Sequence, residues 1–210
     1  MSGSPPVIPY ADELRRKALH LLALVIPAGM LLLGREAAIA ILVPLGLVAM
    51  ALDWARVRHA GARHVLHRLF AGMMRPEEIP ALGEPVKLNG ATMMCVAAAL
   101  CAVTLPVGPA AAGLAMLMVG DGAAAVVGRR VGRHKWPGSP KSVEGTVAMA
   151  LAAFLVGLAV VAWPGAGVTV AACALGAAVA AGVEALPIPI NDNFRVPLLA
   201  GAAMWAAAAL

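Results

Sequence analysis

The sequence predicts an all-α, polytopic membrane protein with about seven transmembrane helices, and three observations lead to that prediction. Of the 210 residues, 61% are hydrophobic and only 13% are charged, whereas a soluble domain carries about 25% charged residues. The apolar residues form runs long enough to cross a bilayer, which takes roughly 20 residues of helix. The basic residues gather at alternate ends of these runs. A disordered chain is excluded, because it would be polar and highly charged.

Seven apolar runs are candidate spans, and together they predict a single integral-membrane domain over residues 1–210. The runs lie at residues 17–34, 36–53, 88–106, 109–128, 142–163, 166–185 and 194–210. Charged residues, Pro or Gly separate them, as in Gly34-Arg35-Glu36. No cleavage site of the signal-peptide type follows the first run, so we expect it to remain as a span.

The distribution of Lys and Arg predicts the orientation of the spans. With seven spans, fifteen of the sixteen Lys and Arg residues fall on the side of the N-terminus, and only Arg35 falls on the other. Because cytoplasmic loops retain Lys and Arg, we expect a cytoplasmic N-terminus in the plasma or inner membrane of a prokaryote. Ten of the eleven acids share that half, which predicts a site at the cytoplasmic face. The formal charge of +5 then reflects topology and not nucleic-acid binding.

Residues 53–87 form the one long connection, which we expect on the cytoplasmic side. Apolar residues recur there at helical spacing with cations between them, a pattern typical of an amphipathic helix in the headgroup region. The periodic residues are Trp54, Val57, Val65, Leu69 and Met73. The three cysteines lie inside apolar runs without paired spacing, so we expect small core residues and neither a disulfide nor a zinc site.

Asp121 is the first candidate functional residue, in the segment 119–146. It precedes Arg129 by eight residues, so on a helix it lies roughly 12 Å inside the apolar run. A carboxylate at that depth costs several kcal/mol unless it lines a wet cavity or meets a cation. Pairing with an arginine for helix packing alone is the alternative. The flanking Gly120 and Gly122 would let the backbone open or a ligand approach.

A basic, glycine-containing stretch follows this span, and we expect it to be flexible. Ser139 and Pro140 predict the N-cap and first residue of the next helix, with Lys141 in its first turn and Glu144 three residues later. The positive end of a helix dipole and its free N–H groups favour an anion. Together with the two acids, these features predict a polyphosphate site with a divalent cation. The alternative is that the basic loop only marks the cytoplasmic side of the membrane and binds no ligand.

Two further polar groups are expected at the same face. Glu13, Arg16, Lys17 and His20 open the first run. Near the other end of the chain, Glu184 precedes Asn191-Asp192-Asn193 at the mouth of the last run. The alternative role of these asparagine and aspartate residues is turn formation and capping.

Three motifs resemble those of the CTP-dependent polyprenol kinases, which include dolichol kinase, phytol kinase and the CTP-using diacylglycerol kinase of fungi. The run Asp121-x2-Ala124-x3-Gly128-x3-Gly132, followed by K-S-V-E-G from Lys141, resembles their nucleotide-binding motif. The opening E-L-R-R-K-A-L-H and the closing E-A-L-P-I-P-I-N-D-N-F-R-V-P resemble their N-terminal and C-terminal elements. The three motifs stand at the start, middle and end of the chain, so the resemblance extends over nearly all of it.

The resemblance implies transfer of the γ-phosphoryl group of CTP to the hydroxyl of a membrane lipid alcohol, with Mg²⁺. The acceptor would be a polyprenol, phytol, a similar isoprenoid alcohol or diacylglycerol. Catalytic candidates are Asp121, Lys141, Glu144, Asp192 and His20, and the three acids among them are the candidate metal ligands. Lys141 would bind phosphate, and Gly128 and Gly132 would be loop glycines. Further candidates for binding the nucleotide are Lys17, Arg129, Arg133, Lys135, Ser139, Ser142, Gly145 and Asn193.

Two alternative functions remain open at this point. The run Ser139-Pro140-Lys141-Ser142 also resembles the phosphatidate cytidylyltransferases, which release pyrophosphate, although this chain has Asn191-Asp192-Asn193 in place of their histidine- and glycine-rich C-terminal signature. A transporter would show repeated halves and polar groups at mid-membrane, and the sequence has no evident repeat. The kinase is the favoured prediction. The sequence selects neither a particular lipid nor an oligomeric state.

Overall fold

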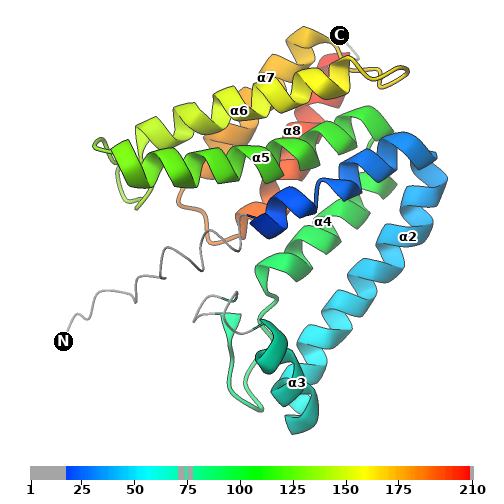
Figure 1. The fold of residues 1–210 in the computed structure, drawn as a ribbon, viewed down its shortest axis with the longest axis vertical. Coiled ribbons are helices and arrows are strands. Elements are labelled where there is room, and N and C mark those ends of the chain that lie inside the picture. The colour runs from blue at the N-terminus through cyan, green and yellow to red at the C-terminus, as the bar shows by residue number, and fades with distance from the viewer. Residues whose placement is uncertain (1–17, 71–73, 75–77, 209–210) are drawn as a thin grey trace.

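The computed structural model describes residues 18–70, 74 and 78–208, and within them the fold is all-α and membrane-like (Figure 1). A helical segment Ala18–Arg58 opens the described chain, and its longer part is α2 (Val25–Arg58). It is followed by α3 (Ala60–Phe70), α4 (Gly90–Thr104), α5 (Val107–Val131), α6 (Val143–Val161), α7 (Val170–Ala185) and α8 (Asp192–Ala208). The predicted fold class is confirmed.

The helices lie where the apolar runs predict them. α4 to α8 each occupy one run, and the first two runs form the segment Ala18–Arg58. Gly34 interrupts that segment with φ 79° and ψ 178°, a conformation that suits a residue without a Cβ, and the chain changes direction sharply there (Figure 1). Ala18–Arg58, α5 and α6 are long and apolar enough to cross a membrane, and α4 and α7 are shorter apolar helices. The span count and the orientation stay predictions.

α5 is the central helix of the bundle. It contacts α2, α4, α6, α7 and α8, and thirteen of its 25 residues are buried. One apolar core fills the space between α5 and α6 to α8, and a second fills the space between α5, α2 and α4. Small residues allow this close packing: a Cβ on Gly113 would lie 2.4 Å from the carbonyl oxygen of Pro197.

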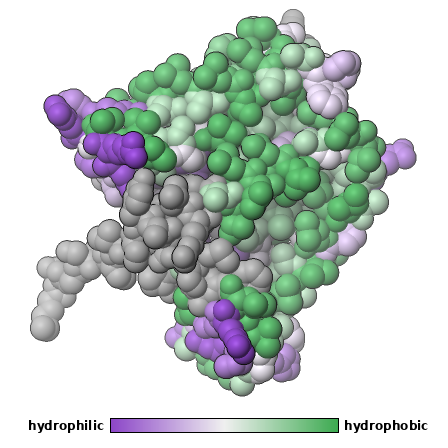
Figure 2. All heavy atoms as spheres, viewed as in Figure 1, coloured by the Kyte–Doolittle hydropathy of each residue, from purple (hydrophilic) through white to green (hydrophobic). Residues whose placement is uncertain are grey.

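The outer surface is largely apolar, as Figure 2 shows, and its hydrophilic side chains gather near the α5–α6 connection and around α3. Leu32 is 68% exposed, Leu33 61%, Leu47 58% and Leu155 66%. Apolar surface of this extent marks a membrane or protein contact. On apolar helices whose backbone groups are paired internally, it fits a bilayer.

The connections that the charge pattern assigns to the cytoplasm meet at one end of the bundle. At the start of α8, Asn193 Nδ2 donates to the carbonyl oxygen of Gly90, at the start of α4, over 2.9 Å. Arg35, the cation assigned to the opposite side, instead donates from Nε to the carbonyl oxygen of Ala102, near the end of α4, over 3.2 Å. The polar groups that the motifs identify therefore converge.

The predicted N-cap of the helix in the fifth apolar run, Ser139, is wrong by three residues. α6 begins at Val143, and its N-cap is Ser142, whose Oγ accepts from Gly145 N over 3.1 Å. Ser139 instead accepts from Lys141 N over 3.2 Å, so Lys141 precedes the helix. The reason is backbone pairing: Val143 N donates to the carbonyl oxygen of His134 over 2.8 Å, which holds the preceding residues extended.

The α5–α6 connection is a short hairpin, where the sequence predicted a flexible loop. Lys135 and Ser142 form an isolated antiparallel bridge, and Trp136 N donates to the carbonyl oxygen of Lys141 over 3.1 Å. The Trp136 indole donates to Thr146 Oγ1 over 2.9 Å, which ties the hairpin to α6. Gly138, with φ +70°, makes the turn.

Gly128 is not a loop glycine, and Gly132 stands where the helix ends and the connection begins. Gly128 lies within α5 and Gly132 is its C-cap. A Cβ on Gly132 would lie 2.5 Å from Ser142 Oγ, and a Cβ on Gly145 would lie 3.0 Å from the carbonyl oxygen of Ala124. These glycines let the end of α5 pack directly against the start of α6.

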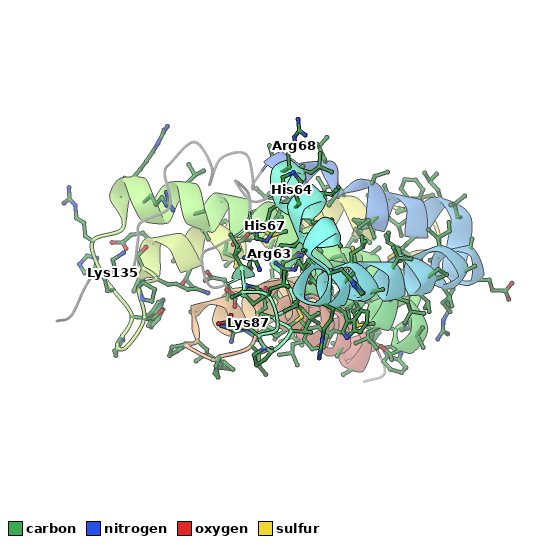
Figure 3. The ribbon with its side chains drawn as sticks, turned by 90° about the horizontal axis from the view of Figure 1, so that it is seen from below. Arg63, His64, His67, Arg68, Lys87 and Lys135 are labelled. Atoms are coloured by element: carbon green, nitrogen blue, oxygen red, sulfur yellow. The ribbon has the colours of Figure 1, made fainter. Side chains whose placement is uncertain are left out.

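The predicted amphipathic stretch 53–87 is divided between two helices. Trp54 and Val57 belong to α2, Val65 and Leu69 belong to α3, and Met73 lies outside the described residues. The basic side chains of α3 are labelled in Figure 3. Burial, together with the charges of Arg63 and Arg56, lowers the pKa of His67 below its usual 6.5, so this imidazole is mostly uncharged at neutral pH.

Candidate active site

Two cavities meet at the end of the bundle where the polar connections converge, and Asp121 and Asp192 line both. The larger cavity, of about 300 Å³, lies among the helix of His20, the end of α2, and α3, α4, α5 and α8. The second, of about 190 Å³, lies among α5, the hairpin, α6, α7 and α8. We call the second one the basic cavity, because Arg129, Lys135 and Lys141 line it.

The basic cavity brings together most of the residues predicted to bind the nucleotide. From that set its walls contain Gly128, Arg129, Lys135, Lys141, Ser142 and Gly145, and they also contain two of the predicted metal ligands, Asp121 and Asp192. These residues come from the central motif, apart from Asp192, which comes from the C-terminal motif. Two segments that are distant in sequence therefore form one cavity.

Lys141, just before α6, contacts motif residues of α7 and α8. Its Nζ lies 2.7 Å from Asp192 Oδ2 and 2.9 Å from Glu184 Oε1, and it also donates to the carbonyl oxygen of Glu184. Arg195 Nε donates to the other oxygen of Asp192 over 2.9 Å. Glu184 is buried and lines the basic cavity. No role was assigned to it from sequence, although an acid near the end of an apolar run is the same signal that identified Asp121.

Asp121 connects the N-terminal motif to the central one. Its Oδ2 lies 3.2 Å from His20 Nδ1, and the two side chains are 18% and 9% exposed. α5 remains helical through the flanking Gly120 and Gly122, so the backbone does not open there. A carboxylate held in this way at the wall between two cavities can orient a polar group on either side.

Glu144 lies apart from the other two predicted metal ligands. Its Oε1 accepts from the backbone N–H groups of Arg133 and His134 over 3.2 Å each and lies 2.7 Å from His134 Nδ1. These contacts fasten the hairpin to α6. Among the described residues, the walls of the two cavities contain Asp121 and Asp192 and do not contain Glu144.

Four other candidates for binding the nucleotide also lie off the basic cavity. Within the described chain, Gly132, Arg133 and Ser139 do not line it, and Asn193 lines the larger cavity instead. Lys17 lies outside the described residues. The side chains that remain for phosphate are those of Arg129, Lys135 and Lys141.

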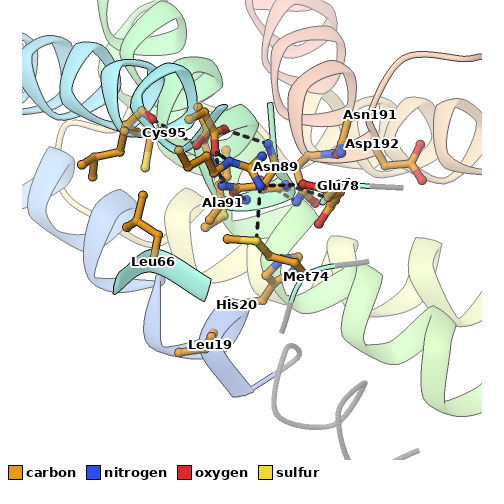
Figure 4. A pocket seen from close by; sticks show the side chains of 18 of the residues that line it. Leu19, His20, Leu66, Met74, Glu78, Asn89, Ala91, Cys95, Asn191 and Asp192 are labelled. Atoms are coloured by element: carbon orange, nitrogen blue, oxygen red, sulfur yellow. Dashed lines mark hydrogen bonds and ion pairs between the residues drawn. The ribbon is translucent and has the colours of Figure 1, made fainter. Parts of the chain in front are cut away.

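A buried polar network that the sequence did not reveal lines the larger cavity (Figure 4). Asp53 accepts from Asn89 N over 2.9 Å and from Asn89 Nδ2 over 2.8 Å. Arg56 Nε lies 2.7 Å from Asp53, and its other nitrogens donate to the carbonyl oxygens of Glu78 and Lys87 over 2.7 Å each. Asp53 and Arg56 are 2% and 1% exposed. The sequence signal is an acid and a base three residues apart at the end of an apolar run, but the charge pattern uses both residues only to predict the topology.

The charges of the basic cavity favour a divalent cation brought in with a polyphosphate. The three cations of this cavity are balanced by its three acids, Asp121, Glu184 and Asp192. The negative charge of bound phosphates would therefore have no counter-charge from these side chains. Among the described residues, no three His, Cys, Asp or Glu side chains are grouped to hold a metal ion by themselves. Mg²⁺ typically needs only one or two carboxylates, with phosphates and water completing its ligands. The residues present therefore fit Mg²⁺ bound together with a nucleotide.

The comparison with known proteins identifies a relative of the expected kind. The chain is 40% identical over 102 residues to phytol kinase of Synechocystis sp., and the match covers 46% of this chain and 43% of that protein. The chain thus matches less than half the length of this relative. No family model and no solved structure matches the chain. The sequence similarity supports the resemblance to the polyprenol kinases that the three motifs indicate.

Proposed function

We propose that this protein is a lipid-alcohol kinase that transfers the γ-phosphoryl group of CTP to the hydroxyl of a membrane lipid. The observation that carries the proposal is the basic cavity, where three cations, the start of α6 and three motif acids surround one space. The similarity to phytol kinase favours a lipid alcohol as the acceptor. The apolar outer surface supports an acceptor that arrives from the bilayer.

The phosphates of the nucleotide would lie in the basic cavity. Lys141, Arg129 and Lys135 would donate charge-assisted hydrogen bonds to them. The positive end of the α6 dipole adds to the same field. Lys141 already holds Glu184 and Asp192, so the phosphate site would be positioned before the nucleotide arrives, which lowers the cost of ordering it.

Asp121 and Asp192 would hold the Mg²⁺ that accompanies the nucleotide. This ion, when bound, supplies neutralisation of the charge on the transferring phosphoryl group. Glu144 acts at a distance by fastening the hairpin that carries Lys135. CTP as the donor follows from the family resemblance, since no feature of the cavity selects a base.

The acceptor hydroxyl would approach the wall that Asp121 forms. The alcohol oxygen bonds to the γ-phosphorus, the bond from that phosphorus to the bridging oxygen breaks, and CDP leaves. The hydroxyl proton passes to a carboxylate at this wall, Asp121 or Asp192. The chain's own contribution is positioning and charge, which is most of what phosphoryl transfer requires.

The test is turnover by the purified protein with CTP labelled in the γ-phosphate and a panel of lipid alcohols. We expect the label in the lipid product and release of CDP. Release of pyrophosphate when phosphatidate replaces the alcohol, with CMP joined to the lipid phosphate, would support the cytidylyltransferase instead. No turnover with phytol, polyprenols or diacylglycerol would contradict the kinase. A parallel series with ATP tests the choice of base.

A further inference from the structure

The larger cavity has an apolar side and a polar end. Side chains from three helices form the apolar side: Leu52 from α2, Leu66 from α3, and Met94 and Cys95 from α4. His20 and Asp121, whose Nδ1 and Oδ2 atoms lie 3.2 Å apart, line its polar part together with the buried network of Asp53, Arg56 and Asn89. A cavity with these two faces fits a molecule that has a single polar end and an apolar body.

The cavity opens toward the apolar exterior of the bundle. Leu19 and Leu52 line it and are nevertheless 44% and 46% exposed, so they form its rim. Leu66 on the amphipathic α3 borders the same space, as Figure 4 shows. A ligand can therefore extend from the polar end, past leucine side chains, to the lipid-facing surface.

The wall shared with the basic cavity fixes which end of such a ligand is reactive. Asp121 and Asp192 line both spaces. When a hydroxyl lies against Asp121 in the larger cavity, only the Asp121 side chain therefore separates it from the phosphates in the basic cavity. Among the described residues, these two acids are the only ones that line both cavities, so the apolar side of the larger cavity does not border the basic one there.

We propose that the larger cavity binds the acceptor as a primary alcohol on a single slender chain. Its hydroxyl lies beside His20 and Asp121, and its chain leaves between Leu19 and Leu52. The volume of about 300 Å³ is at the lower end of the roughly 300–1,000 Å³ of ligand sites. It accommodates the hydroxyl end of one chain, whereas diacylglycerol brings two ester-linked chains close to its hydroxyl. This assignment of the acceptor site rests on the proposed kinase function.

Cys95 provides a direct probe of the occupant. It is partly exposed and lines the cavity, whereas Cys101 and Cys173 are buried. We expect N-ethylmaleimide to modify Cys95. Saturating phytol should slow this modification at least fivefold. Peptide mass spectrometry measures the modification of each cysteine separately. The saturated hydrocarbon without the hydroxyl should protect weakly. Protection by dioleoylglycerol and not by phytol would overturn the single-chain assignment.

A blocking substitution tests the same site by kinetics. Cys95→Trp should fill the cavity and raise the KM for the alcohol at least tenfold, while CTP binding stays within twofold of wild type. Leu100→Trp is the matched control, because Leu100 lies on the same helix, is 38% exposed and does not line the cavity. Should Cys95→Trp misfold, the protection experiment on the wild-type protein decides.

Two different results would contradict the acceptor site and the kinase function. Kinase turnover without protection of Cys95, and with an unchanged KM in Cys95→Trp, would overturn the acceptor site and leave the kinase intact. Protection by phytol without any CTP-dependent turnover would contradict the kinase and leave a lipid-alcohol site.

Discussion

Lys141 has both a structural and a chemical role in this protein. Its ammonium group lies within 2.9 Å of both Glu184 and Asp192. It therefore holds the end of α7 and the start of α8 against the start of α6. Removing it would leave two carboxylates together, one of them buried, and an unpaired buried charge is destabilising. Loss of activity in a Lys141 variant is therefore informative only when its stability is measured too.

We expect Lys141→Ala to reduce CTP affinity or turnover at least about tenfold, because charge-assisted hydrogen bonds are worth about 1.5–3 kcal/mol each. The melting temperature should also fall. Adding Glu184→Gln should restore the melting temperature and not the activity. Wild-type CTP kinetics in the single variant would remove Lys141 from the nucleotide site.

Asp121→Asn keeps the shape of the side chain and removes the charge that a divalent cation prefers. We expect the variant to fold normally, to lose nearly all phosphoryl transfer, and to bind CTP with a weaker dependence on Mg²⁺. Activity, CTP binding and melting temperature should be measured on one preparation. Full activity with a raised melting temperature would mean that Asp121 only packs helices.

At the scale of the elements, the junction of α5 with α6 positions the basic cavity. Gly128, Gly145 and the N-cap Ser142 lie at this junction and line the cavity. Glu144 and Trp136 hold the hairpin across it. The glycines of the motif therefore serve close approach between two helices, and the field at the cavity depends on that approach.

Two glycine substitutions separate this role from a general effect on α5. Gly132→Ala should lower the melting temperature and weaken CTP binding, because its Cβ would come within 2.5 Å of Ser142 Oγ. Gly122→Ala, in the same helix, meets nothing within 4 Å and should be neutral or stabilise by about 0.5–1 kcal/mol. Thermal unfolding and CTP titration measure both effects. Equal behaviour of the two variants would argue against the packing role.

Local sequence pattern predicted the helices, because hydrophobic runs and their breaks lie within a single segment. It did not predict the contacts that complete the site. Lys141 and Asp192 are 51 residues apart, and Asp53 and Asn89 are 36 apart, so only the packed bundle brings them together. The start of α6 was misplaced because pairing between Lys135 and Ser142 overrides the capping preference of Ser139.

At the scale of the whole molecule, the charge pattern agrees with the way in which the helix ends meet. The polar connections gather at one end, and Arg35 lies with the end of α4 at the other. The sequence could predict this arrangement because alternate loops of a bundle necessarily share an end, whatever the details of packing.

The orientation can be tested with reporters. A reporter fused after Leu210 is expected on the non-cytoplasmic side, and one inserted within 129–140 is expected in the cytoplasm, because cytoplasmic loops retain Lys and Arg. Protease accessibility in intact and opened cells is the measurement. Both reporters on the same side would refute the seven-span arrangement.

The wall that Asp121 and Asp192 share between the two cavities has a consequence for steady-state kinetics. Separate spaces for donor and acceptor allow both to be bound at once, so transfer should proceed through a ternary complex without a phosphorylated enzyme. Initial-velocity lines at varied CTP and alcohol should then intersect, and CDP should not exchange label with CTP until alcohol is added. Parallel lines with exchange in the absence of alcohol would instead reveal a two-step relay, in which a side chain at this wall carries the phosphoryl group between the cavities.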